Sequence, residues 1–453
     1  MKPIIFLLVA NLLASAECIV NNPGGSKINP NRPSDADAPA ARFSAMSEFN
    51  KRLPDWVCFT LGYRTRYEGY SGLNFEPHSS DSYLLTRFRL GVLVSPASWL
   101  SVYSEVQDAD AFGKSEPLGP PYQETWDLRR AYLDIGNMQE GHLALRAGRQ
   151  DLNFEDGRLV GTSYWRNASR GYDAVQGVTN WASVTAAVFA ASQVLPADNG
   201  LSHYAPGNNL YGADAKWKRA IPSGLVEPFF LWRLTPNLKT EEGAPAKLDE
   251  KIAGVRIAGT IHNAWDYDSE AVLETGNQGS DRVRAHGWLG TAGYTFRRIR
   301  YRTRIFGEYD YASGDRHPGD GAHGTFDPLF PNVHDRLGLA DQFAWQNLKA
   351  VRAGARVWLR KNWIVAGAWG DYRLASATDA FYSATGGILA RDPKGLSGTH
   401  IGQEYDLQTS YRLNRDLEFG AGIGHILPGQ FLKNTNHPEP YTYPYVMMSY
   451  NIF

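Results

Sequence analysis

Charged and apolar residues alternate in the stretch from Thr125 to Gln150, and its charged residues are the ones that could do chemistry. Neighbouring residues of a β-strand point to opposite faces, so Arg130 and Asp134 would share one face while Leu133 lies on the other. After a tight turn, Arg146 again opposes apolar neighbours. A guanidinium group keeps its charge and binds carboxylates through two parallel hydrogen bonds. In a soluble sandwich the arginines would simply face solvent, so these two strands alone decide nothing. Repeated around the whole chain, the pattern would build a wall with lipid outside and a positively charged lumen inside.

The same opposition of charged and apolar faces continues along the chain. A charge facing lipid at mid-bilayer costs ~2–4 kcal/mol, so a membrane barrel would turn such charges toward its lumen. An alternative is that they form only a structural ladder of cross-strand ion pairs. Alternation predicts these lumen residues: Arg64, Arg66, Arg87, Arg89, Arg130, Asp134, Arg146, Arg302, Arg304, Arg352, Arg356, Glu404 and Asp406.

The elements that would position these side chains are about eighteen segments, each near the ~10 residues that a tilted strand needs to cross a bilayer. Short turns alternate with long polar loops, as in barrels with periplasmic turns at one rim and extracellular loops at the other. We predict an all-β fold, a single antiparallel transmembrane β-barrel. Its long loops are expected at 71–82, 110–124, 151–170, 193–207, 236–249, 276–284, 314–345, 376–398 and 428–440.

The ends of the chain divide it into three parts. Residues 1–16 combine an early Lys, an apolar run and a small-residue cleavage site, which predicts a secretory signal peptide. Residues 17–54 are rich in Pro, Asn and charge and are expected to form a flexible periplasmic segment, with a short helix at 40–51. Residues 55–453 would form the barrel. No later stretch has the ~20 apolar residues of a transmembrane helix, so a membrane location, the bacterial outer membrane, requires a closed barrel.

Composition and spacing exclude several functions. The formal net charge of −1 argues against nucleic acid as a partner, because phosphates call for a broadly basic surface. The 11 His are scattered without metal-ligand spacing. GAGIG at 420–424 lies within a predicted strand, with no helix after it, and is no phosphate loop. We therefore expect no catalytic residues, no enzyme activity, no cofactor and no metal.

Several motifs together resemble the alginate export family of outer-membrane porins. They are LRRAYLDI at 128–135, LRAGRQ at 145–150, RGYDAVQG at 170–177, IGQEYDLQTSYRL at 401–413 and GAGIGHILPGQF at 420–431. The resemblance implies an eighteen-stranded monomeric barrel with an arginine-lined constriction for an anionic polysaccharide, and it adds Arg149 to the lumen residues. Strict alternation would aim Arg149 at lipid, so either the strand bulges at Gly148 or Arg149 lies at the rim.

These observations predict passive passage of anionic solutes, in the sharpest form export of an alginate-like polysaccharide. One alternative is an uptake porin for small carboxylates or oligosaccharides, and another is a structural or adhesive barrel plugged by its loops. The expected partners are outer-membrane lipids, an anionic polysaccharide or small anions, and periplasmic export or assembly proteins. Whether loops 314–345 and 376–398 fold into the lumen is left open by the sequence.

Overall fold

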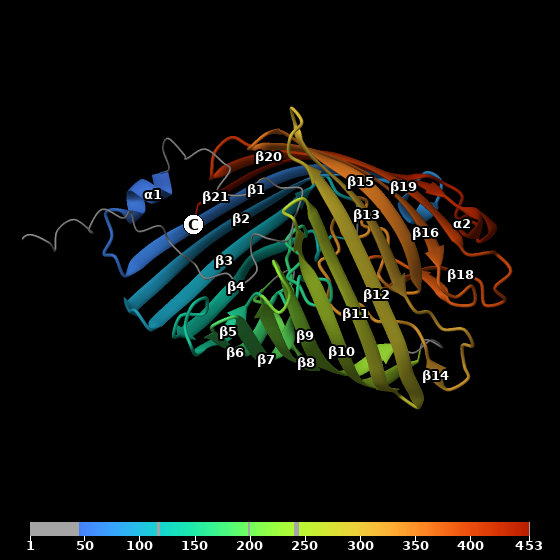
Figure 1. Cartoon of the computed structure of the whole chain (residues 1–453), viewed down its shortest axis with the longest axis horizontal. Coiled ribbons are helices and arrows are strands. Elements are labelled where there is room, and N and C mark those ends of the chain that lie inside the picture. The colour runs from blue at the N-terminus through green and yellow to red at the C-terminus, as the bar shows by residue number, and fades with distance from the viewer. Residues whose placement is uncertain (1–44, 116–117, 198–199, 240–243, 453) are drawn as a thin grey trace, which may run out of the picture.

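A closed barrel forms the body of the protein in a computed structural model that describes residues 45–115, 118–197, 200–239 and 244–452 (Figure 1). The main sheet has 19 strands, of which β14 (Ala322–His323) is a two-residue addition beside β12. The other 18 build the barrel: β1 (Val57–Ser71), β2 (Ser80–Ala97), β3 (Leu100–Phe112), β4 (Glu124–Ile135), β5 (Ala144–Gln150), β6 (Tyr172–Trp181), β7 (Val184–Leu195), β8 (His203–Lys218), β9 (Gly224–Lys239), β10 (Pro245–Ile261), β11 (Trp265–Gln278), β12 (Asp281–Phe296), β13 (Arg302–Ala312), β15 (Leu348–Arg360), β16 (Trp363–Leu374), β19 (His400–Arg412), β20 (Leu417–Pro428) and β21 (Tyr441–Ile452).

Barrel closure follows from antiparallel pairing of each strand with the next and of the last strand with the first. In the closing pair, Leu61 stands opposite Ile452 and Glu68 opposite Tyr445. Closure leaves no barrel strand with an unpaired edge, the condition for a sheet in hydrocarbon. The prediction of an all-β, single antiparallel barrel of about 18 strands is confirmed.

The two ends of the barrel carry different additions. Helix α1 (Ala45–Asn50) precedes β1 at one end, within the helix expected at 40–51, while α2 (Gln430–Asn434) and the hairpin of β17 (Ala380–Tyr382) and β18 (Ile388–Arg391) lie at the other (Figure 1). The predicted signal peptide at 1–16 and most of the 17–54 segment fall outside the described residues.

The prediction of a long loop at 276–284 was wrong. Strand β11 runs to Gln278 and β12 begins at Asp281, so only two residues connect them. The pairing continues in register to the end, with Gln278 opposite Asp281. Gln278 and Val283 both point inward and are buried, so alternation persists here even though the local composition is polar.

The outer surface of the barrel is apolar and carries tryptophans near the periplasmic turns. Val188, Leu273 and Val446 are 59–66% exposed on the strands. Five exposed tryptophans lie within two residues of a short turn: Trp99, Trp181, Trp217, Trp265 and Trp363. Tryptophan rings favour the membrane–water interface, so this row marks the periplasmic edge of the lipid band. No helix in the described part of the chain has the length and apolar character to span a membrane.

Two long loops fold into the barrel and fill much of its extracellular half. Residues 151–171 and 313–347 contact each other through backbone hydrogen bonds between Phe330 and Leu159 and between Asn332 and Gly157. Leu159 and Phe326 are fully buried, in one apolar cluster with strand residues such as Leu231. Of the two loops left open by the sequence, the first therefore lies inside. In the second, Phe381 packs on Phe343, with ring centroids 5.7 Å apart.

Arginine 146 offers a test of how strongly the lumen charges stabilise the barrel. Its side chain is 2% exposed and donates to both carboxylate oxygens of Asp134, at 2.6 and 2.7 Å. Arg146→Met should lower the free energy of unfolding by ~3–5 kcal/mol, because it leaves a buried carboxylate without its cation. Arg149→Met is the matched control and should cost ~0–1 kcal/mol, since its partner Asp173 is 36% exposed. Urea unfolding in lipid vesicles measures both, and equal losses would contradict the prediction.

Candidate functional site in the lumen

Arginines on strands β1 and β2 hold loop 151–171 inside the barrel. Arg64 donates to the backbone carbonyls of Tyr164 (2.9 Å) and Arg166 (3.1 Å). Arg87 donates to the same two carbonyls, at 3.1 and 3.2 Å. Arg89 donates to the hydroxyl of Ser169 at 2.7 Å. These acceptors are neutral, and among the described residues none of the three arginines has a carboxylate within ion-pair distance.

A stack of side chains joins the two inward loops to the wall. The guanidinium carbon of Arg66 lies 3.9 Å from the ring centroid of Trp165, whose indole stacks on His334 at 3.6 Å. Trp165 belongs to loop 151–171 and His334 to loop 313–347, and His334 is within 2.8 Å of Asp341. The hydroxyl oxygen of Tyr443 accepts a hydrogen bond from the indole N–H of Trp165 at 3.3 Å. Arg66 therefore supports both loops and also forms an ion pair with its neighbour Glu68.

A β-bulge places two adjacent arginines on the inner face of β4. Glu105 pairs with Arg130 and Val106 with Leu128, so Arg129 is the extra residue. Both arginines are buried, Arg130 against Glu105 (2.9 Å) and Arg129 against Asp151 (2.5 Å). Strict alternation had assigned only Arg130 inward. The consecutive Arg129-Arg130 in an otherwise alternating strand was the available signal for a bulge.

Of the two placements that the sequence left open for Arg149, a bulge at Gly148 or a position at the rim, the structure favours the rim. The pairing of β5 continues without a shift through Gly148, so Arg149 stays on the same side as the exposed Leu145 and Val175. It lies one residue from the extracellular end of β5 and forms an ion pair with Asp173 at 2.9 Å. Arg149 is thus a rim residue of the outer face and not a lumen residue, while Arg146 and Asp134 pair on the inner face.

A cavity of about 830 Å³ lies in the barrel beside the two inward loops. Its lining includes Arg302, Arg304, Arg352, Arg356 and Asp406 from the predicted set. Arg304 pairs with Asp266 and Arg352 with Glu308, whereas Arg302 lies 4.2 Å from the ring of Trp358. The predicted residues therefore divide into arginines behind the loops and arginines that border open space.

The carboxylates of β19 hold the second loop. Glu404 is fully buried and accepts from the backbone N–H of Ala340 at 2.8 Å, and Asp406 accepts from that of Leu339 at 3.3 Å. Gly338 has a φ of +119°, and a Cβ there would lie 2.0 Å from a Glu404 oxygen. This close approach requires glycine, and both acids position loop 313–347.

Acidic residues that the sequence analysis missed face the lumen on strands β9 to β11. They are all buried: Glu227, Glu250, Glu270 and Glu274. Asp310 of β13 is buried as well. Alternation could have found Glu270 and Glu274, because they lie on the face of β11 opposite to that of the exposed Leu273. Glu227 shares its face with the buried Phe229 and Leu231, so both faces of β9 look apolar in the sequence. The lumen is consequently arginine-rich on β1 to β5 and carboxylate-rich on β9 to β13.

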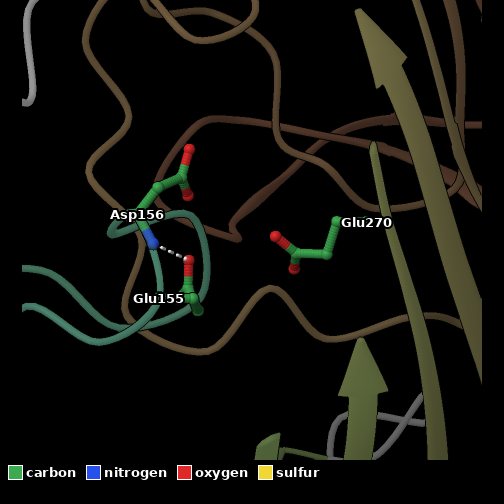
Figure 2. A group of neighbouring side chains, drawn as sticks. All are labelled: Glu155, Asp156 and Glu270. Carbon is green, nitrogen blue, oxygen red and sulfur yellow. Dashed lines mark hydrogen bonds between the residues drawn. The ribbon is translucent and has the colours of Figure 1, made fainter. Parts of the chain in front are cut away.

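Glu155 and Asp156 of the inward loop meet Glu270 of β11 (Figure 2), with oxygens within 4.8 Å of one another. Two unit charges at that separation repel by about 3 kcal/mol at an effective dielectric constant near 20. Burial and then the negative charges of Glu270 and Asp156 raise the pKa of Glu155. Burial opposes ionisation of Asp156 too, but the guanidinium groups of Arg336, Arg256 and Arg158 lower its pKa.

Comparison with known proteins identifies the family and the fold. The sequence profile named "Alginate export" matches residues 55–441. No curated protein sequence is detectably similar to the chain. Among solved structures, OpdK of Pseudomonas aeruginosa with vanillate has a TM-score of 0.59 at 10% identity, covering 87% of this chain and 98% of that chain. OccK8 (OprE) of the same organism gives 0.58 at 12% identity (87% and 98%), and OccAB4 of Acinetobacter baumannii 0.56 at 11% (93% and 99%). These likenesses show the barrel fold of bacterial outer-membrane porins.

The hydrogen bonds from the wall arginines to loop 151–171 can be tested by removing their donors. Replacing Arg64 and Arg87 together by Gln should free residues 164–167, because their carbonyls lose the guanidinium donors. Hydrogen–deuterium exchange of this segment should rise by about tenfold, equivalent to ~1.4 kcal/mol of opening free energy. Arg304→Gln is the control, since Arg304 pairs with Asp266 on the wall. Exchange that is unchanged in the double variant would show that the other contacts of the loop suffice to hold it.

Proposed function

The chain belongs to the alginate export family, and from this premise we propose that it is a passive outer-membrane channel for anionic solutes, in its sharpest form for export of an alginate-like polysaccharide. Membership in this family and the porin-like barrel support a transport role. The observation that carries the anionic part of the proposal is the charge at the periplasmic end of the cavity.

Basic residues without acidic partners gather where the cavity approaches the periplasmic turns. Lys218 ends β8, Arg297 follows β12 and Arg302 begins β13, and all three line the cavity. Within the described part of the chain, none of the three has a carboxylate within ion-pair distance. The turn between β12 and β13 adds exposed Arg298 and Arg300. A cluster of one sign at a channel mouth raises the local concentration of ions of opposite charge, so this mouth favours polyanions arriving from the periplasm.

The aromatic ring beside Arg302 suits a uronate unit. Arg302 and Arg356 lie 4.2 and 5.6 Å from the ring of Trp358, on the wall of the cavity. Guanidinium groups bind carboxylates in bidentate fashion, and an indole face packs against the apolar face of a sugar ring. Asp266 and Asp406 in the same cavity counter part of this charge, which keeps the anion from binding too tightly to leave.

Uptake of small carboxylates is the second candidate function. The likeness to OpdK, whose structure contains vanillate, supports it at the level of fold. A cavity of about 830 Å³ is within the size range of small-molecule sites. The packing of loops 151–171 and 313–347 in the extracellular half also favours small solutes, because a polymer would require both loops to move.

Ion selectivity tests the anionic channel. In planar bilayers the wild-type protein should prefer anions, and replacing Arg297 and Arg302 by Gln should move the anion-to-cation permeability ratio toward one, because the mouth loses uncompensated charge. Arg149→Gln, on the outer rim, should leave the ratio unchanged. A wild-type channel that prefers cations would end the proposal.

Solute uptake into liposomes separates the two candidate functions. Protein-containing liposomes should swell faster with uronate oligomers than with neutral oligosaccharides of the same length, and Trp358→Ala should narrow the difference by removing the stacking surface. Swelling with monomeric carboxylates but not with uronate oligomers would favour small-solute uptake. Equal rates for charged and neutral solutes of one size would contradict both.

A further inference from the structure

Three acidic side chains meet beside the cavity from two separate parts of the chain. Glu155 and Asp156 lie in inward loop 151–171, and Glu270 comes from the barrel wall on β11. Figure 2 shows the carboxyl group of Glu270 pointing toward the other two. One oxygen from each residue can be chosen so that all three lie within 4.8 Å of one another. The cluster therefore forms only when the loop has folded into the barrel.

The neighbouring cations neutralise this cluster only in part, because two of the three have their carboxylate partners outside it. Arg158 pairs with Asp310 at 3.2 Å, and Arg256 pairs with Asp268 at 2.6 Å. Arg336 pairs with Asp156 at 2.8 Å. Among the residues that the structure describes, Glu155 and Glu270 have no cation within ion-pair distance.

Glu155 is held in place by its own loop. Its carboxylate accepts backbone N–H groups from residues 156, 158, 159 and 160 at 2.7 to 3.2 Å. These bonds fix the orientation of the carboxylate without cancelling its charge. The loop is thereby preorganised to present negative charge toward β11.

Glu270 supplies the observation that points to a ligand. Glu270 is 2% exposed, and its Oε1 atom has no hydrogen-bond partner among the residues that the structure describes. Buried carboxylates are costly unless they are hydrogen-bonded, paired or bound to a metal. A buried carboxylate that has an unpartnered oxygen and is directed at two further carboxylates has the chemistry of a cation ligand.

We propose that Glu155, Asp156 and Glu270 bind one divalent cation, with Ca²⁺ the best fit, and that this ion fastens loop 151–171 to strand β11. Ca²⁺ takes six to eight oxygen ligands in flexible geometry, and carboxylates on a loop and a strand satisfy it more readily than the strict octahedron of Mg²⁺. Asp156 and Glu270 line the cavity, which gives the ion a route in and water for its remaining positions. The site is independent of which solute the channel carries.

Calcium titration of the full chain tests the site. The protein is refolded into zwitterionic detergent without lipopolysaccharide, which binds divalent cations itself, and is then treated with chelator. Calorimetry with CaCl₂ should show one ion per chain, and Glu270→Gln should weaken the affinity by roughly tenfold or more, since affinity follows the charge of the ligands. Ca²⁺ should also slow hydrogen–deuterium exchange at residues 155–160 in the wild type.

Glu274→Gln is the matched control. Glu274 lies on the same strand and the same inner face, is equally buried and also has an oxygen without a partner, but it is outside the cluster. Its variant should bind Ca²⁺ as the wild type does. No saturable binding to the wild type, or equal binding by Glu270→Gln, would overturn the proposal. One further result would overturn it: Glu270→Gln stabilises the chelated protein, while Ca²⁺ has no effect on the wild type. A proton shared among the carboxylates would then account for the cluster.

Discussion

Hydrogen bonds from wall arginines to the backbone carbonyls of loop 151–171 are the interaction on which the interior of this barrel depends. A loop inside a barrel brings polar backbone groups away from bulk water, and each of them needs a partner. Arg64 and Arg87 provide donors to the carbonyls of Tyr164 and Arg166. A guanidinium group offers five donors in a fixed plane, so one side chain can serve two carbonyls. The same arginines therefore position the loop and contribute positive charge to the interior of the barrel.

The use of neutral acceptors has an electrostatic consequence. Where an arginine pairs with a carboxylate, as Arg146 does with Asp134, its field is largely cancelled. Where it binds carbonyls, the field persists across the lumen. The opposite wall carries Glu227, Glu250 and Glu274. The interior is thus polarised from β1–β5 toward β9–β13, and loop 151–171 bridges the two sides, with Arg64 at one end and Glu155 facing Glu270 at the other.

Lipid imposes the complementary constraint on the outer face. Apolar residues such as Val188 and Val446 cover the strands, and tryptophans mark the periplasmic edge. The charges that a solute would meet are therefore confined to the interior and the rims. Arg149 illustrates the boundary: it points outward but lies at the extracellular rim, beside Asp173, where water is available to a charge.

The sequence by itself determined the closed antiparallel barrel and its strand number. The reason is that side-chain alternation has a period of two and lipid penalises any charge on the wrong face, so each strand carries the evidence locally. The pattern failed where local geometry breaks the period, as at the bulge of Arg129, and where the inner face is itself apolar, as on β9. Only the tertiary structure decided which arginines border the cavity and which hold loops, because the partners of Arg64 are 100 residues away in the chain. The meeting of Glu155 with Glu270 has the same origin, since an inward-folded loop leaves no periodic trace in the sequence.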